Sequence, residues 1–283
     1  MEEALKRNGK KVDIIMQTKI AKKFAPIIGQ NRVDKFIIPY EEKRYDLAFV
    51  LDVADFNRTY YDIKYKSNKI VIIDHHLNDN VPKVDYYLNE NDASTGITVY
   101  KLIKQLSPIT DTIATAIYLT IRDDTSNFKN SNTTSQTMSF ASELLLYNAN
   151  IQIVNSIYDY KTPAYIKLLS IVLKNIKIDS KNKIAHLIIS KSDIMESKSN
   201  AKEAGLIIDL LKTIEGIDIA LVFIETNNSV TIKARSKNFN VNNIIMEFGG
   251  GGHECASACV LPSDDIYMTR DRVVTRFIEE MNK

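Results

Sequence analysis

The chain has 283 residues, of which 45% are hydrophobic and 25% charged, with 37 Lys+Arg against 35 Asp+Glu and a formal net charge of +2 at pH 7. This near balance excludes a protein that binds long duplex nucleic acid through bulk positive charge. The longest apolar runs are far shorter than the roughly 18 residues of a membrane span. The charged N-terminus lacks the apolar core of a signal peptide, so we expect a cytoplasmic protein, and the length suggests two domains.

The first third of the chain alternates apolar runs with helical patterns. Strands are predicted at residues 12–16, 46–51 and 69–73, and a helix is predicted to start at Thr18. Continuous β-branched runs separated by helical stretches are typical of strands that are buried on both faces of a parallel sheet. The pattern predicts an α/β fold, with a doubly wound parallel sheet in the N-terminal domain.

The middle of the chain reads as helical, so this domain has a helical second half. Ser94 and Thr95 can cap a helix that runs to about Leu106. Further helices are predicted at residues 111–122, 133–148, 151–158 and 165–178.

The polar stretch at residues 179–183 follows the last of these helices and is typical of a domain boundary. We therefore expect a first domain at residues 1–160, a connecting helix and linker at 161–183, and a smaller α/β domain at 184–283.

The C-terminal block mixes strands and helices. Strands are predicted at 184–189, 219–225 and 230–235, and helices at 201–215 and 241–248, before a glycine loop, a strand and a final helix. The pair Asn227-Asn228 between two apolar runs indicates a hairpin. His186 lies alone in an apolar run and is interpreted as structural.

Three carboxylates directly follow apolar segments. Asp52 follows a strand, Asp74 follows the next strand and precedes His75 and His76, and Asp124 ends an apolar helix. Because the carboxyl ends of parallel strands meet at one crevice, Asp52 and the Asp-His-His triplet should lie close together. Carboxylate and imidazole suit a divalent ion such as manganese. The alternative, a cap or turn role, is the commoner one for a single aspartate after a strand.

A second group of residues indicates anion binding. Residues 249–252 are four consecutive glycines followed by His253. Glycine allows a backbone to approach a ligand closely, and successive N–H groups form an anion-binding concavity. The alternative is a flexible hinge. Arg235 and Ser236 end the strand before this loop, where a guanidinium fork can clamp a phosphate, unless they form an ordinary solvated strand end.

These motifs resemble those of the DHH phosphoesterases. Asp52, the run Ile73-Asp74-His75-His76 and Asp124 match the DHH domain, while Lys233-Ala-Arg-Ser-Lys237 with the glycines and His253 matches the DHHA1 substrate domain. The two motif sets occur in the expected order and cover nearly the whole chain. The arrangement is similar to the bacterial group of short-oligoribonucleases (nanoRNases) and phosphoadenosine-phosphate phosphatases.

The resemblance implies a two-manganese phosphoric ester hydrolase acting as a 3'-5' exoribonuclease or phosphatase on short RNA or a small nucleotide. The metal ligands would be Asp52, His75 and Asp124, while His76 would face the scissile phosphate and Asp74 would support the histidines. The substrate-binding residues would be Arg235, Ser236, Gly250, Gly251, Gly252 and His253. A homodimer is compatible with the sequence.

One departure from the family pattern leaves alternatives open. The family's first strand and its His-x-x-x-Asp-x-Asp motif have no counterpart here, so three of six expected ligand side chains remain. We therefore expect at most one well-bound manganese ion and weak hydrolysis. The chain is then either a phosphoesterase whose recorded start is internal or a nucleotide-binding remnant. A manganese pyrophosphatase shares the Asp-His-His element but carries a different C-terminal domain.

Overall fold

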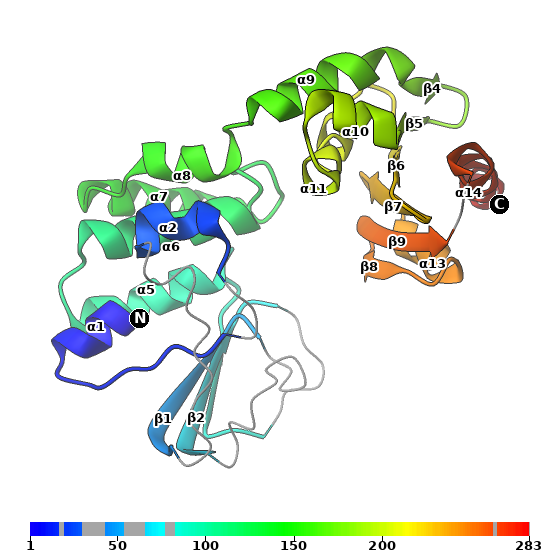
Figure 1. Cartoon of the computed structure of the whole chain (residues 1–283). Coiled ribbons are helices and arrows are strands. Elements are labelled where there is room, and N and C mark those ends of the chain that lie inside the picture. The colour runs from blue at the N-terminus through cyan, green and yellow to red at the C-terminus, as the bar shows by residue number, and fades with distance from the viewer. Residues whose placement is uncertain (17–19, 30–42, 54–65, 77–82, 263–264, 283) are drawn as a thin grey trace. The chain divides into compact units, whose positions relative to one another are not determined.

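A computed structural model describes residues 1–16, 20–29, 43–53, 66–76, 83–262 and 265–282 (Figure 1). The chain divides into two compact units, Met1–Tyr160 and Lys161–Lys283. Within the described residues, no helix is long and apolar enough to cross a membrane.

The sheet of the first unit is parallel, and its described strands run in the order β1-β2-β3. Strand β1 (Tyr45–Leu51) pairs with β2 (Ser67–Asp74), which also pairs with β3 (Tyr86–Asn89). The two strands predicted at 46–51 and 69–73 are confirmed, whereas β3 was not predicted from the sequence. Because β1 and β2 are parallel, the residues that follow them lie at the same edge of the sheet.

The predicted strand at residues 12–16 is wrong. This segment is described, but it forms no strand, and its apolar side chains are at best partly buried. Its Asp13 carboxylate instead accepts a 2.8 Å hydrogen bond from the Tyr45 hydroxyl. Strand propensity reflects packing against neighbouring strands, so a short β-branched run without a paired neighbour does not become a strand. The predicted helix start at Thr18 lies outside the described residues.

Helices follow the sheet and pack over it. The core between them contains Ile73 of β2 with Ile97, Tyr100 and Ile121, all at most 1% exposed. The predicted helices between residues 95 and 158 are confirmed to within two residues at each end. The helices of this unit are α1 (Glu2–Arg7), η1 (Lys22–Phe24), α2 (Ala25–Ile28), α5 (Thr95–Leu106), α6 (Asp111–Asp124), α7 (Ser135–Leu146) and α8 (Ile151–Tyr158).

The second unit contains a mixed sheet whose described strands run in the order β4-β5-β6-β7-β9-β8. The pair β5 and β6 is parallel and the other pairs are antiparallel. The predicted hairpin between β6 and β7 is confirmed. The strands are β4 (Lys177–Asp179), β5 (Ile184–Ile189), β6 (Ile219–Glu225), β7 (Ser229–Ser236), β8 (Gly251–His253) and β9 (Ala256–Pro262).

The helices of the second unit differ from the predictions in two places. The helix predicted at 165–178 ends at Val172, and residues 177–179 form β4, so the polar stretch 179–183 connects β4 to β5. The helix predicted at 201–215 is two short helices with Gly205 between them. The connecting role of residues 161–183 stays a prediction. The helices are α9 (Pro163–Val172), η3 (Leu173–Asn175), α10 (Lys191–Ser197), α11 (Ala201–Ala204), α12 (Ile208–Lys212), α13 (Val241–Glu247) and α14 (Ile266–Met281).

The two faces of this sheet are covered unequally. Alternate residues of β6 enter two different cores, Phe223 on the side of α13 and α14 and Val222 on the side of α9 to α12. On β7, the residues that enter the first core are buried, whereas the intervening Thr231, Lys233 and Arg235 are only half-buried. The second face is therefore partly open over β7 and β9.

Candidate metal centre and anion-binding face

Asp52 begins the metal centre at the end of β1. Its backbone N–H donates to the Ile73 carbonyl at 2.9 Å, which extends the ladder to β2 by one residue. Its φ of 63° then turns the chain into the left-handed region, where aspartate is among the residues best tolerated. The Thr95 hydroxyl at the start of α5 donates a 2.7 Å hydrogen bond to Asp52 Oδ1. Thr95 thus orients a candidate ligand rather than acting as a helix cap.

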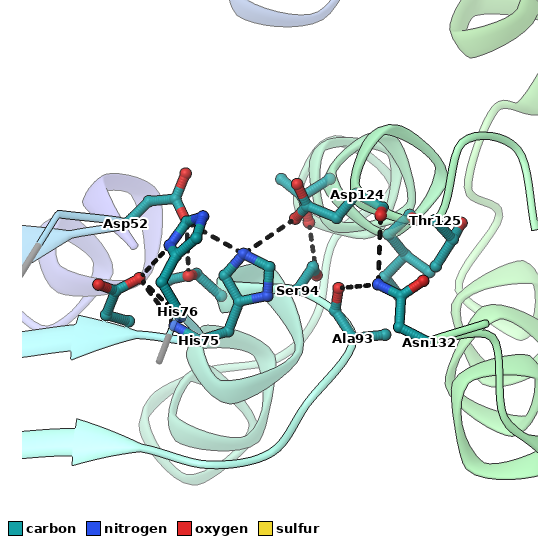
Figure 2. A network of polar contacts seen from close by, with 12 residues as sticks. Asp52, His75, His76, Ala93, Ser94, Asp124, Thr125 and Asn132 are labelled. Atoms are coloured by element: carbon teal, nitrogen blue, oxygen red, sulfur yellow. Dashed lines mark hydrogen bonds and ion pairs between the residues drawn. The ribbon is translucent and has the colours of Figure 1, made fainter. Parts of the chain in front are cut away.

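His75 lies between two carboxylates from distant parts of the chain. Its Nε2 atom is 3.6 Å from Asp52 Oδ1 and 4.0 Å from Asp124 Oδ2 (Figure 2). This Nε2 is buried and has no hydrogen-bond partner among the described residues. Metal–ligand bonds of about 2.0–2.2 Å place two ligands of one ion no more than about 4.4 Å apart. Each of the two carboxylates is therefore close enough to His75 Nε2 to share an ion with it.

Asp74 is nearly fully buried, at 1% exposure, and its carboxylate contacts both of the histidines that follow it. Its Oδ1 accepts hydrogen bonds from the backbone N–H groups of His75 (2.8 Å) and His76 (3.3 Å), and it lies 2.7 Å from His76 Nδ1. Burial alone would raise the pKa of Asp74, but these hydrogen bonds, led by the His76 side chain, lower it. The buried carboxylate of Asp74 thus holds the His76 ring through its Nδ1 atom.

Asp124 is the last residue of α6 and completes the group. Burial, followed by repulsion from Asp52 and Asp123 and opposed by attraction to His75, raises the pKa of Asp124 to about 6. The Asn132 amide donates 3.2 Å hydrogen bonds to the carbonyls of Ala93 and Asp124 and so connects two loops (Figure 2). The sequence analysis did not predict that Thr95 contacts Asp52 or that Asn132 joins two segments of the site, because single hydroxyl and amide residues carry no recognisable spacing.

The side chains of Asp52, His75 and His76 offer ligand atoms that all lie within 4.8 Å of one another. This compact group contains His76 and not Asp124, which contacts it through His75 at 4.0 Å. The ligand set Asp52, His75 and Asp124 therefore stays a prediction. Oxygen and nitrogen donors of this kind suit manganese or a similar divalent ion.

A second polar face lies in the other unit, across β7, β9 and β8. In the strand register, Arg235 is opposite Ala256, which is opposite His253, so these three residues form one row on the same sheet face. Two strand spacings separate Arg235 from His253, about 10 Å. In this row only the small side chain of Ala256 stands between them.

The glycine loop is more structural than its composition suggests. Gly249 ends α13 with a φ of 74°, and a Cβ on Gly250 would clash with β9 and come within 2.7 Å of Ile245. A Cβ on Gly252 would lie 2.8 Å from the Ser257 backbone. A Cβ on Gly251 would meet no atom within 4 Å. Gly250 and Gly252 therefore have packing reasons, and Gly249 has a backbone reason in its positive φ, whereas Gly251 has neither.

Ser236 lies in a different setting from the one expected. It is fully buried, and its hydroxyl donates to the Phe239 carbonyl. The hydroxyl therefore supports the turn after β7, and its complete burial argues against direct contact with a ligand.

Two family models match this chain, the DHH family N-terminal domain over residues 1–121 and the DHHA1 domain over residues 181–283. Together with the α/β fold, they define a protein of two domains, a DHH domain and a DHHA1 domain. The chain belongs to the DHH/DHHA1 family, and both the predicted resemblance and the predicted fold class are confirmed.

Several known proteins are similar to this chain. It is 28% identical over 225 residues to the "Bifunctional oligoribonuclease and PAP phosphatase NrnA" of Bacillus subtilis, covering 77% of this chain and 71% of that protein. A probable NrnA of Streptococcus mutans is 29% identical over 240 residues, covering 80% and 75%. The crystal structure of an exopolyphosphatase-related protein from Bacteroides fragilis matches with a TM-score of 0.84 at 19% identity, covering 100% of this chain and 88% of that one, which shows the shared fold.

Proposed function

We propose that this chain is a manganese-dependent phosphoesterase that hydrolyses short oligoribonucleotides, 3'-phosphoadenosine 5'-phosphate, or both. The observation that carries the proposal is the buried, unpartnered Nε2 of His75, held 3.6 Å from Asp52 and 4.0 Å from Asp124. The names of the relatives supply the substrate class. A buried ring nitrogen between two carboxylates is costly unless a cation or proton joins them.

In this proposal each residue of the first unit has one task. Asp52, His75 and Asp124 hold the ion, which when bound lowers the pKa of water and neutralises charge on phosphate oxygens. Thr95 fixes the Asp52 carboxylate through its 2.7 Å hydrogen bond. Asp74 holds His76 by its Nδ1 atom at 2.7 Å, which leaves the exposed edge of the ring to contact the substrate phosphate.

In this proposal, residues of the second unit bind the substrate. Arg235 and His253 share one row of the sheet face, and the backbone at Gly250, Gly251 and Gly252 runs beside it. Cations and glycine backbone favour a small anionic ligand over a long duplex. The cytoplasmic location and a homodimer stay predictions.

A nucleotide-binding protein with little or no hydrolysis is the second candidate. One observation favours it. Among the described residues, only one group of at least three metal-ligating side chains lies close together, and it consists of Asp52, His75 and His76. One such cluster fits one ion, whereas the two-metal mechanism of in-line displacement uses two.

The two candidates are separated by measuring metal binding and hydrolysis on the same sample. Titration calorimetry with Mn²⁺ gives the number of ions. Hydrolysis of a short RNA, of 3'-phosphoadenosine 5'-phosphate and of pyrophosphate is then compared with Mn²⁺ and with EDTA. Asp52→Asn should abolish both binding and turnover. Asp46→Asn, an exposed carboxylate at the other end of β1, is the matched control and should change neither.

Turnover of either nucleotide substrate that disappears in EDTA supports the phosphoesterase. One bound ion with no turnover of any substrate supports the binding protein, and a preference for pyrophosphate would support a pyrophosphatase. Full activity in EDTA or in Asp52→Asn would refute the role of the metal centre.

A further inference from the structure

Two consecutive aspartates, Asp123 and Asp124, end helix α6, and they have different surroundings. Asp124 Oδ2 lies 4.0 Å from His75 Nε2, whereas Asp123 is exposed. An α-helix turns by about 100° per residue, so neighbouring side chains leave it in different directions. Because helix ends fray easily, a small rotation of the last turn would move Asp124 away from His75. The metal centre therefore needs something that fixes this end of α6.

Tyr158, the last residue of α8, holds the first of the two aspartates. Its hydroxyl hydrogen-bonds to the Asp123 carboxylate. Burial, followed by the negative charge of Asp123, raises the pKa of this hydroxyl, so it stays a donor. Two cations lie over the ring, with Lys23 Nζ 4.6 Å and Arg122 Cζ 4.7 Å from its centroid. Tyr158 thus connects α8 to the last turn of α6.

Arg122 is a buried cation two residues before Asp124. The residue is 4% exposed, and its Nη2 atom lies 2.6 Å from Asp159 Oδ1. Its Nε atom is buried and has no hydrogen-bond partner among the described residues. An unpaired buried N–H is costly, and an apolar side chain of similar size usually packs as well as a buried ion pair. Stability alone therefore gives no reason for an arginine at this position.

The chain leaves α6 through a strained turn. Three consecutive non-glycine residues adopt left-handed φ values between 49° and 61°, namely Ser126, Asn127 and Phe128. This conformation is unfavourable for residues with a Cβ and persists only where surrounding contacts enforce it. One such contact is the 2.7 Å hydrogen bond that the Asn127 N–H donates to the Arg122 carbonyl. The backbone is thus constrained on both sides of Asp124.

We infer that Arg122 and Tyr158 are positioning residues that direct the Asp124 carboxylate towards His75 and so set the Mn²⁺ affinity of the metal centre. Tyr158 holds Asp123 through its hydroxyl, and Arg122 packs against the Tyr158 ring, so the last turn of α6 keeps one rotation. The inference rests on the proposed function, since it requires Asp124 to be a ligand of the ion.

The experiment measures the dissociation constant of Mn²⁺ for the full chain, from the free ion detected by electron paramagnetic resonance. Tyr158→Phe removes the hydroxyl and keeps the ring, while Arg122→Met removes the guanidinium and keeps most of its volume. Each variant should weaken Mn²⁺ binding by about tenfold, as is typical of residues that orient metal ligands. Tyr160→Phe, at a tyrosine that is 74% exposed, is the matched control and should bind as the wild type does.

A double-variant cycle separates positioning from a general structural role. Asp124→Asn should by itself weaken Mn²⁺ binding by about 30- to 100-fold, because it removes a ligand charge. Adding Tyr158→Phe to Asp124→Asn should cost less than about a further twofold, because positioning requires the carboxylate that is positioned. A residue that only stabilises the fold would instead cause the same loss in both backgrounds.

A variant of Arg122 or Tyr158 that binds Mn²⁺ as the wild type does would overturn the positioning role of that residue. A full tenfold further loss in the double variant would overturn it as well. If Asp124→Asn leaves the affinity unchanged, the proposed ligand role of Asp124 fails, and the positioning role fails with it. If Asp124→Asn weakens binding and the other two variants do not, only the positioning role fails. The readout is independent of turnover, so a protein without hydrolysis would refute the phosphoesterase alone.

Discussion

The two polar sites of this chain are built in opposite ways. In the first unit, carboxylates and histidines from β1, β2 and α6 converge on one point, where His75 Nε2 lies within 4.0 Å of both Asp52 and Asp124. In the second unit, polar side chains are spread over neighbouring strands, with Arg235 and His253 separated by a whole strand. In the proposed function, the first site holds a cation at one position, whereas the second site binds an anion through separate contacts.

This difference leads to different consequences of mutation. A metal site depends on every ligand, because each contributes several kcal/mol to one ion. A sheet face binds through several separate contacts, and each contributes a smaller amount that affects affinity. Chemistry should therefore fail abruptly in the first unit, and binding should weaken in steps in the second.

The largest effect is expected for His75→Ala. Removal of this ligand should lower hydrolysis by about 1000-fold or more and weaken Mn²⁺ binding, because the two carboxylates lose the nitrogen between them. Binding of AMP in EDTA should stay within about twofold of the wild type. His186→Leu is the matched histidine control in the other unit and should retain hydrolysis. A His75→Ala protein with more than a tenth of wild-type activity would remove the contrast between the two sites.

The metal centre was largely predictable from sequence because its residues directly follow buried strands. Asp52 and the Asp-His-His triplet stand at strand ends, and the rule that parallel strands end at one edge brings them together. Asp124 could be joined to them only through the family resemblance. Thr95 and Asn132 could not be found in this way, because their roles depend on three-dimensional contacts of 2.7 Å and 3.2 Å with no local pattern.

The second site was predictable in residue type but not in arrangement. The cross-strand rows depend on register, which alternating hydrophobicity does not specify for a short strand such as Gly251–His253. The failure at residues 12–16 has a related cause, since a strand exists only with its neighbour. The helix predicted at 201–215 is too long because residues 205–207 form a turn between α11 and α12, which the helical pattern of the sequence does not reveal.

Arg235→Ala should produce a graded effect of a different kind. Loss of charge-assisted hydrogen bonds to a substrate phosphate should raise KM by about 10- to 100-fold, while kcat changes by less than about threefold. The measurement is steady-state hydrolysis of a short RNA with Mn²⁺, with Lys212→Met as the control. If kcat fell and KM stayed constant, Arg235 would act in the chemical step, and the division between the two units would be wrong.

The glycines test whether the second site is a packed scaffold or an open ligand surface. Gly250→Ala should destabilise the protein by about 1–3 kcal/mol, because its Cβ would crowd Ile245 and β9. Gly251→Ala should leave stability nearly unchanged, since its Cβ meets no atom, but should weaken nucleotide binding. Thermal unfolding and calorimetry on both variants separate the two effects. Equal destabilisation by the two changes would contradict the assignment of Gly251 to the ligand face.

The smallest effect concerns the histidine that resembles His75 but has different neighbours. His186 on β5 also has a buried ring nitrogen without a partner, Nδ1, and its ring lies edge-on to Phe223 with centroids 6.5 Å apart. Among the described residues no carboxylate forms an ion pair with His186, although the charges of Asp271 and Asp179 act to raise its pKa. Burial, followed by the positive charge of Arg270, instead lowers the pKa of His186 to about 4. A neutral histidine in this position is a packing residue.

The pH dependence of unfolding tests this difference. Because the pKa of His186 is about 4 in the folded chain and about 6.5 when unfolded, the unfolded state binds more protons between these values. Stability is therefore complete above pH 6.5 and is lost as the pH falls towards 4, by about 1 kcal/mol once solvent screening is allowed for. In His186→Leu this loss should disappear. The stability of the variant relative to the wild type should therefore be greater at pH 5 than at pH 7.5. Parallel unfolding curves for the two proteins over this range would mean that His186 is protonated in the fold. It would then have to be regarded, like His75, as a histidine with an acidic partner.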